Sequence, residues 1–360
     1  MRTCLIARAG VVTLVLVVAV LAAGCGSDGE AEADPAPPDA SAPTVNDEDP
    51  TDATSTTSSA AAPSTTTTEL PADLADDGRQ IIALDEQAAL TLLSLDVWPD
   101  NVMVTLASET FAQLNDGLGI PTTEFVIAEP SFEVLAALSP DLLVSIGSPF
   151  VVDSIEAYEA VAPIVVAPLD ATWQQQLTSV AAGLGAEDRA AALIEAVDAH
   201  ADATAAALDA AGTGDTSVSV VTARVGAILA VNASGATGEL LTQIGLDRPA
   251  AQRATGNPGI PFVPVSPETI LDHDADLLLL PRAAIFDLDP FTSAPLYAEL
   301  GAVADGGVHD VVADAWVLGG TGFASFWALE DMRSLLVEGA APAGLADTAD
   351  RWSAFLELIG

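Results

Sequence analysis

Apolar and polar positions form two kinds of pattern along the chain from about residue 80 onward. Short runs of branched aliphatic residues predict buried strands, and stretches with one apolar face predict the helices between them. The strand-like runs lie at 80–84, 101–105, 125–128, 142–146, 164–166, 218–221, 228–232, 277–280 and 308–312, and the run at 228–232 has the character of a hairpin. Strands that alternate with helices predict an α/β fold with mainly parallel sheets covered on both faces.

One pattern of twelve residues occurs twice. Glu133-Val-Leu-Ala-Ala-Leu-Ser-Pro-Asp141-Leu-Leu-Val144 recurs in type and spacing as Glu268-Thr-Ile-Leu-Asp-His-Asp-Ala-Asp276-Leu-Leu-Leu279. Each copy predicts a helix, a tight turn and a buried strand. Two copies indicate two similar lobes, and chains with two lobes commonly hold a ligand in the cleft between them.

A long helical candidate, residues 186–211, separates the two copies. Apolar or small residues recur on one face of it, at Ala190, Leu193, Ile194, Val197, Ala201, Thr204 and Leu208. Such a stripe predicts one buried face, and a helix of this length spans about 39 Å. We therefore predict an N-terminal lobe at 78–171, a connecting helical segment at 172–212 and a C-terminal lobe at 213–360, with little closure of the lobes on ligand binding.

The N-terminus has the features of an export signal. Arg2 and Arg8 precede an apolar run from Val11 to Ala23, which is short for a membrane span. The stretch 21–25 resembles the bacterial lipoprotein cleavage signal, in which the Cys, here Cys25, carries the lipid. We predict a signal peptide at 1–24 and a lipid anchor on the extracytoplasmic face of the cell membrane; an ordinary signal peptide with an incidental Cys is the alternative.

Residues 25–77 are rich in Ser, Thr, Pro, Ala, Asp and Glu. A segment with so few apolar side chains cannot offset its ordering entropy, so we predict a disordered tether, with a reach of about 40 Å. The second Cys, Cys4, lies in the predicted signal, so no disulfide is expected. The net charge of −42, with Arg as the only basic residue type besides His, argues against nucleic acid as a partner.

From residue 80 onward the chain resembles the periplasmic binding proteins for ferric siderophores, haem and cobalamin, the binding components of ABC importers. The resemblance rests on the order of several pieces: 92–99, 130–144, 158–163, the long helix, 265–276 and 329–332. It implies two similar lobes joined by one long helix, and a monomeric protein that delivers a ferric siderophore to a permease and its ATPase. Iron would enter only as part of the ligand, with no cofactor. Haem or cobalamin binding, or a surface receptor or sensor partner without transport, are the alternatives.

The resemblance also implies two docking residues. The family places a Glu at the start of a helix on top of each lobe, where it pairs with Arg residues of the permease, and the matching residues are Glu133 and Glu268. A local account competes, because Ser131 and Ser266 would cap these helices and an acid in the first turn stabilises the helix dipole. The presence of a Glu at equivalent positions of both lobes favours the docking interpretation.

Ligands of open α/β sheets bind beyond the carboxyl ends of the strands. The candidates in those loops are Phe111, Ser148, Phe150, Arg224, Arg282 and Trp316. A guanidinium binds carboxylate, catecholate or hydroxamate oxygens in bidentate fashion. The alternatives are a surface ion pair for each Arg and core packing for each aromatic ring.

The charge of the chain bears on the class of ligand. A ferric tris-catecholate carries about three negative charges, which this acidic protein repels over the ~8–10 Å that salt leaves unscreened. We therefore expect a hydroxamate-type siderophore. The three His residues, His200, His273 and His309, are scattered, and Gly-x-Ser-x-Gly and His-Glu-x-x-His motifs are absent, so neither a site for a bare metal ion nor an enzyme is expected.

Overall fold

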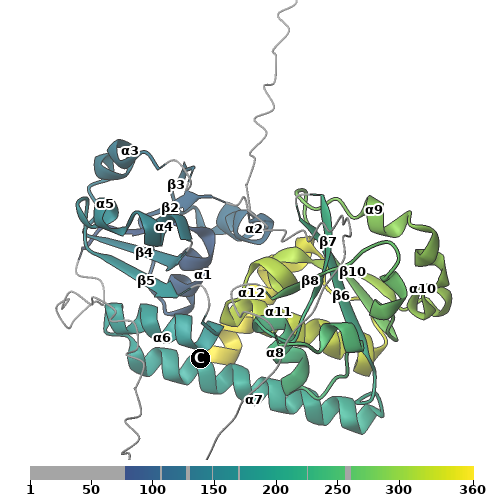
Figure 1. The fold of residues 1–360 in the computed structure, drawn as a ribbon. Helices are drawn as coiled ribbons and strands as arrows, with labels where there is room; N and C mark the ends of the chain where they lie inside the picture. The colour runs from purple at the N-terminus through teal and green to yellow at the C-terminus, as the bar shows by residue number, and fades with distance from the viewer. Residues whose placement is uncertain are drawn as a thin grey trace, which may run out of the picture. The chain divides into compact units, whose positions relative to one another are not determined.

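The computed structural model describes residues 78–105, 108–126, 130–147, 149–168, 171–224, 226–255 and 261–360, all within one compact unit (Figure 1). The predicted signal peptide, Cys25 and the predicted tether lie outside the described residues. Within the described ranges, no helix is both long enough and apolar enough to cross a membrane.

The first sheet is entirely parallel. Its strand order is β3 (Thr122–Glu124), β2 (Asn101–Val104), β1 (Ile81–Ala83), β4 (Leu142–Gly147) and β5 (Ile164–Pro168). Its helices are α1 (Glu86–Ser94), α2 (Glu109–Leu118), α3 (Phe132–Ala137), α4 (Pro149–Asp153), α5 (Ile155–Glu159) and α6 (Trp173–Leu184). We call this sheet and these helices the first lobe.

Both faces of the first sheet are buried at its centre, where β1 and β4 are buried at every position and apolar at all but Ser145. Ile81 and Ala83 pack in a cluster with α1, α2 and α6, whereas Ile82 packs in a second cluster with α3, α4 and α5. This alternation is the two-residue period of a strand. It explains why unbroken aliphatic runs in the sequence predicted the central strands correctly.

The prediction of a strand at 125–128 does not hold for Phe125 and Val126, which belong to no strand, while residues 127 and 128 lie outside the described residues. The strand at this place is β3, Thr122–Glu124, which lies at the edge of the sheet and carries polar side chains. Phe125 is buried directly after it and supplied the apolar signal. An edge strand is held by backbone pairing with one neighbour, so hydrophobic periodicity does not reveal it.

The second sheet is mixed. Its order is β10 (Val308–Val312), β9 (Leu277–Arg282), β6 (Val218–Arg224), β7 (Ala227–Val231) and β8 (Phe262–Pro264), in which β10, β9 and β6 are parallel and β7 and β8 antiparallel. The predicted hairpin at 228–232 is confirmed as the β6–β7 pair. We call this sheet the second lobe, with α8 (Ala236–Gln243), η1 (Ala250–Gln252), η2 (Ile270–His273), α9 (Asp289–Thr292), η3 (Pro295–Glu299) and α10 (Gly301–Asp305).

The repeated pattern folds alike only in part. The first copy forms α3 and β4 as expected, but the second forms a turn and the short 3-10 helix η2 before β9. Asp274 ends this helix, because its carboxylate accepts the N–H groups of Ala275 and Gly301 at 3.0 and 2.8 Å. Aspartate that binds nearby backbone competes with helix formation.

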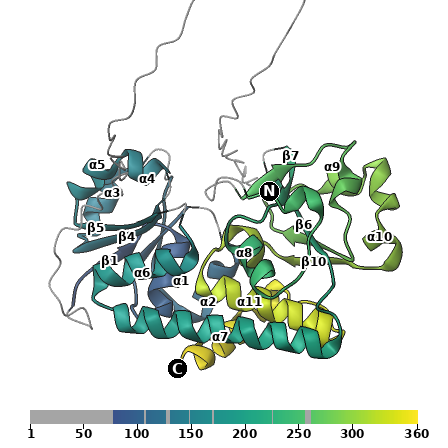
Figure 2. The ribbon, with the colours of Figure 1, turned by 60° about the horizontal axis from the view of Figure 1, so that its bottom comes forward.

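The long helix is confirmed as α7 (Glu187–Ala211), which runs beneath both sheets in Figures 1 and 2. Six of its seven predicted stripe residues are buried, and Ile194 is half-buried. The helix ends at Gly212, whose φ of 73° suits a residue without Cβ. Its partner helices include α6, α8, α11 and α12.

The predicted lobe boundaries need two corrections. Helix α6, which we assigned to the connecting segment, packs against β5 of the first sheet. The chain after β10 forms η4 (Asp314–Leu318), α11 (Gly322–Arg333), η5 (Ser334–Glu338), η6 (Leu345–Asp347) and α12 (Thr348–Ile359), and it returns to the first lobe, where α12 contacts α2. One hydrophobic cluster therefore joins both sheets with α7, α11 and α12.

Candidate functional site

The carboxyl ends of the strands in the two lobes face each other through α2 and η4. The Ser108 hydroxyl donates a hydrogen bond to Asp314 Oδ2 at 2.8 Å, and the Thr110 N–H donates to the same oxygen at 2.7 Å. Nearby, the Ala284 N–H donates to Glu109 Oε1 at 3.1 Å. An acid of the second lobe thus caps the N-terminus of a helix of the first, which is the favourable end for negative charge.

Arg224, the last residue of β6, has the most unusual environment in this region. Its guanidinium carbon lies 4.9 Å from the centre of the Phe262 ring and 5.9 Å from that of Phe286. One terminal nitrogen donates to the Val317 carbonyl at 3.1 Å, while the buried Nε has no hydrogen-bond partner. Burial lowers the pKa of Arg224, but a guanidinium stays protonated in proteins.

No carboxylate in the described part of the chain forms an ion pair with Arg224. A cation between two aromatic faces is stabilised by their quadrupoles. The Arg224 guanidinium still has N–H groups that can donate hydrogen bonds to a ligand. The arrangement suits a ligand that has anionic or carbonyl oxygens together with apolar surface.

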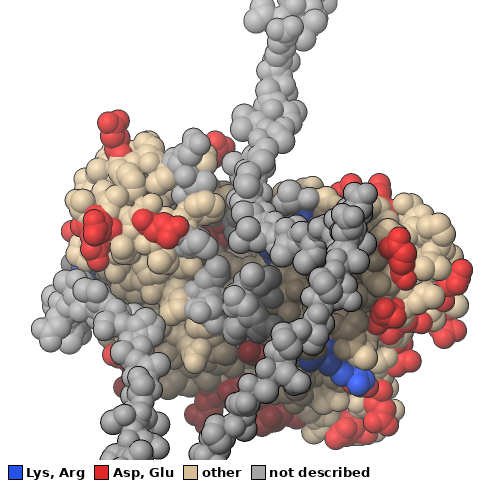
Figure 3. Space-filling view, viewed as in Figure 1, with Lys and Arg blue, Asp and Glu red and all other residues tan. Residues whose placement is uncertain are grey.

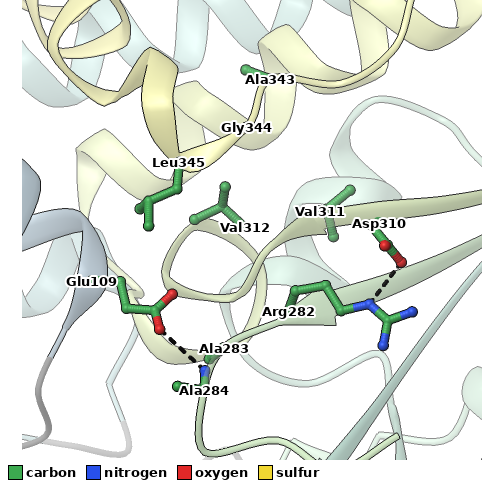
Figure 4. A pocket seen from close by; sticks show the side chains of 10 residues that line it. All are labelled: Glu109, Arg282, Ala283, Ala284, Asp310, Val311, Val312, Ala343, Gly344 and Leu345. Carbon is green, nitrogen blue, oxygen red and sulfur yellow. Dashed lines mark hydrogen bonds and ion pairs between the residues drawn. The ribbon is translucent and has the colours of Figure 1, made fainter.

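Arg282, at the end of β9, is arranged differently. Its Nε donates to Asp310 Oδ1 at 2.7 Å in an exposed ion pair, which is the alternative that the sequence left open. It lines a cavity of about 350 Å³ beside the Glu109–Ala284 contact (Figure 4). The remaining lining is Ala283, Val311, Val312, Ala343, Gly344 and Leu345. Arg224 does not line this cavity, so the two arginines do not converge on one space.

Two of the aromatic rings that were predicted to contact the ligand are buried in the core. Phe111 and Trp316 are only 2% and 1% exposed and pack in the main hydrophobic cluster. The Trp316 indole N–H donates to Asp331 Oδ2 at 2.9 Å, which satisfies the one polar atom of the ring. Phe150, on α4, is 38% exposed and available to a ligand. Ser148 lies outside the described residues.

The π-helical turn η4 was not predicted from the sequence, although several of its backbone and side-chain groups form hydrogen bonds with other elements. The carbonyls of Trp316, Val317 and Leu318 accept from Thr237, Arg224 and Gln87 respectively. Single π-helical turns occur frequently at functional sites. The glycines that follow, at 319, 320 and 322, were the one sequence signal of an unusual turn.

A buried acid lies at the carboxyl end of β1. Asp85 caps α1 by accepting the Ala88 N–H at 2.7 Å, and it also accepts from the Ser145 hydroxyl at 2.9 Å and the Ile146 N–H at 3.0 Å. Burial raises the pKa of Asp85 to about 7, against the effect of these hydrogen bonds. An Asp between a strand and a helix is a typical N-cap, so this role was visible in the sequence.

The two predicted docking acids are exposed, but their local settings differ. Glu133 lies in the first turn of α3, although Ser131 makes no side-chain capping bond. Glu268 lies in the turn before η2, so it is not in the first turn of a helix, and Ser266 instead bonds Thr269. The capping account is therefore wrong for the second lobe, and a helix dipole does not explain the acid at 268.

Metal ligands are not grouped in the described parts of the chain, where no three His, Cys, Asp or Glu residues could hold an ion together. His273 is buried against Gln252, with 3.2 Å between its Nδ1 and the amide nitrogen, and burial lowers its pKa. On the face shown in Figure 3, acidic side chains are spread over both lobes and basic ones appear in few places.

Comparison with known proteins identifies the fold. The family model described as periplasmic binding protein matches residues 81–315. No curated protein matches the chain. Staphylococcus aureus SirA is 21% identical with a TM-score of 0.61, and the match covers 71% of this chain and 97% of SirA.

Two further solved structures have the same fold. FhuD2 from Staphylococcus aureus with bound ferrioxamine B is 18% identical, with a TM-score of 0.61 and coverage of 72% of this chain and 98% of FhuD2. The siderophore periplasmic binding protein from the fuscachelin gene cluster of Thermobifida fusca is 21% identical, with a TM-score of 0.56 and coverage of 72% and 97%.

Proposed function

Because the chain belongs to the periplasmic binding protein family, we propose that it captures a ferric siderophore outside the cytoplasm and passes it to an ABC importer. As a family member it is a substrate-binding protein rather than an enzyme, and it needs no cofactor. The observation that carries the proposal is Arg224, a half-buried cation at the carboxyl end of β6 that lies over two aromatic rings.

The Arg224 environment fits the chemistry of an iron complex of this kind. Such a complex presents oxygen atoms with partial or full negative charge over an organic framework that is partly apolar. The guanidinium would donate to those oxygens, and Phe262 and Phe286 would contact the framework. Leaving Arg224 without a carboxylate partner would keep it available for this purpose.

The surrounding charges support a ligand of low negative charge. Asp314 belongs to η4, the turn whose Val317 carbonyl accepts a hydrogen bond from Arg224, and the whole chain carries −42. One guanidinium cannot compensate a ferric tris-catecholate, which carries about three negative charges. A hydroxamate complex, neutral or cationic, has no such cost. In the matched structures FhuD2 holds ferrioxamine B, while SirA has been solved with staphyloferrin B.

Delivery and anchoring complete the proposal. Exposed acids at Glu133 and Glu268, one in each lobe, would pair with basic residues of a permease, which would orient the protein and raise its rate of association.

Cys25 would carry the lipid that keeps the protein on the extracytoplasmic face of the membrane. Cys25→Ser should then release the protein into the medium, and continued membrane retention would count against the lipid anchor.

The direct test is calorimetric titration of the purified chain with ferrioxamine B, a ferric catecholate, haemin and cobalamin. The metal-free siderophores serve as controls. Saturable binding of ferrioxamine B, with a weaker response to its metal-free form, is the expected result. Tighter binding of the catecholate would overturn the hydroxamate assignment, haemin or cobalamin alone would select the alternative ligands, and no binding across the panel would reject siderophore capture.

A further inference from the structure

The π-helical turn η4 holds Arg224 through a backbone carbonyl. One terminal nitrogen of Arg224 donates to the Val317 carbonyl at 3.1 Å, and the Thr237 hydroxyl donates to the carbonyl of Trp316, the residue before it. A single π-helical turn is short and uncommon. The orientation of the Arg224 guanidinium therefore depends on whatever keeps η4 in place.

On the side of the core, η4 is attached through Trp316. Among residues 315–318 this is the only one whose side chain has a polar atom. Its indole N–H donates to Asp331 Oδ2 at 2.9 Å, and the two side chains are 1% and 0% exposed. Because Asp331 belongs to α11, this hydrogen bond joins η4 to a helix of the core.

Burial of an indole does not by itself require such a carboxylate. Trp327 is 0% exposed, and its indole N–H has no hydrogen-bond partner among the described residues. A carboxylate in the core is costly, and burial raises the pKa of Asp331 to about 6. Asp331 Oδ1 accepts the Ala343 N–H at 3.0 Å and lies 3.6 Å from the Arg351 guanidinium. One oxygen thus serves the packing of the C-terminal segment, and the other is directed to η4.

We infer that Trp316 and Asp331 are positioning residues for the ligand site. Their hydrogen bond fixes η4, the next carbonyl in the chain fixes one nitrogen of Arg224, and the other N–H groups of the guanidinium stay available to a ligand. A side chain that is already ordered loses less entropy on binding. The effect on affinity rests on the proposed function, whereas the effect on Arg224 itself needs no ligand.

The first test measures Arg224 without ligand. Its Nε is buried, so the Nε–H should exchange slowly with solvent. Trp316→Phe keeps an aromatic ring and removes the indole N–H, and it should accelerate this exchange at least about threefold. Trp327→Phe is the matched control, because it makes the same change in the core without loss of a hydrogen bond. NMR follows the exchange, with Arg224→Gln to assign the signal.

A second pair of variants keeps the inference testable if Trp316→Phe folds poorly. Thr237→Val has nearly the same shape and removes the hydroxyl that donates to the Trp316 carbonyl. Thr222, two residues before Arg224, is buried and its hydroxyl has no partner in the described part of the chain. Thr237→Val should accelerate exchange of the Arg224 Nε–H, and Thr222→Val should leave it within about twofold.

The second test measures affinity for ferrioxamine B by calorimetry. Trp316→Phe should weaken binding by about 3- to 10-fold, and Trp327→Phe by less than about twofold. In an Arg224→Gln background Trp316→Phe should have no further effect, because it acts through Arg224. A general loss of stability would weaken binding equally in both backgrounds, and that result would overturn the inference.

Failure of the proposed function would look different. In that case ferrioxamine B would not bind the parent, or Arg224→Gln would leave its affinity unchanged. The exchange rates then decide the inference alone. Equal exchange of the Arg224 Nε–H in Trp316→Phe and Trp327→Phe would show that the Trp316–Asp331 bond does not position this side chain.

Discussion

At the scale of single residues, Arg224 and Arg282 form a natural pair for comparison. Both end strands of the second sheet, but only Arg282 has a carboxylate partner, Asp310, in the described residues. Hydrogen bonds to charged groups contribute about 1.5–3 kcal/mol. The two arginines therefore have different expected roles: ligand contact for Arg224 and a surface ion pair for Arg282.

We predict that Arg224→Gln weakens binding of ferrioxamine B by about 10- to 100-fold, because the ligand oxygens lose a charged donor. Arg282→Gln should change the affinity by less than about twofold. Calorimetric titration of both variants checks this. Equal losses in the two variants would show that the predicted contact at Arg224 is wrong.

Asp85 leads to a prediction about pH. Burial raises the pKa of this acid to about 7 in the folded protein, from 3.8 in its ordinary state. The folded state therefore binds the proton more tightly than the unfolded state between these values, and this group makes the free energy of unfolding fall as pH rises from about 4 to 7.

Asp85→Asn should remove that contribution, since Asn still caps a helix but does not titrate. The difference in unfolding free energy between variant and parent should then grow with pH, by up to about 1.4 kcal/mol per pH unit. Urea denaturation at several pH values between 4.5 and 7.5 measures it, with the exposed Glu133→Gln as the control. A pH-independent difference would contradict the raised pKa.

At the scale of elements, α2 and η4 form a polar contact between the lobes. Asp314 is buried and accepts from Ser108 and Thr110 at the N-terminus of α2, whereas Glu109 makes its contact to Ala284 at an exposed position. Buried charge-assisted hydrogen bonds stabilise more than exposed ones, and their loss leaves donors without partners.

We therefore predict that Asp314→Ala lowers the free energy of unfolding by about 1–3 kcal/mol. Glu109→Ala, on the same helix end, should cost less than about 1 kcal/mol. Chemical denaturation gives both values, and a double-mutant cycle with Ser108→Ala should show coupling between 108 and 314. Additive effects of the two substitutions would argue that the contact between the lobes carries no energy of its own.

At the scale of the whole molecule, α7 and one hydrophobic cluster join both lobes. A shared core resists large rotation of the lobes, because opening it would expose buried apolar side chains. We predict that the radius of gyration measured by small-angle scattering changes by less than about 1 Å on addition of ferrioxamine B. A larger decrease would indicate hinge closure in spite of the brace.

Docking to a permease would involve one exposed acid from each lobe, Glu133 and Glu268, and so concerns the whole molecule. If Glu133 and Glu268 dock a permease, the double charge reversal Glu133→Arg/Glu268→Arg should abolish siderophore uptake by cells. Ferrioxamine B affinity should stay within about twofold, because both residues are exposed and neither lines the cavity beside Arg282. Reversal of two other exposed acids, Glu187 and Asp188, is the matched control. Unchanged uptake would favour the receptor or sensor alternative.

The sequence by itself determined the central strands, the long helix with its buried face and the family. These features depend on neighbours along the chain: aliphatic runs that bury both faces of a sheet, and a 3.6-residue stripe that faces one core. It also predicted Arg224 correctly as a residue at the end of a strand of the second sheet.

Only the tertiary structure decided which of the candidates share an environment. Arg282 ends a strand and Trp316 follows one, yet the Trp316 indole donates a hydrogen bond to Asp331 in the core, whereas Arg282 pairs with Asp310 at the surface. Phe262, Phe286 and η4 surround Arg224 from separate parts of the chain, and α12 returns to the first lobe. Such contacts depend on how elements far apart in sequence pack together, and local periodicity carries no information about that.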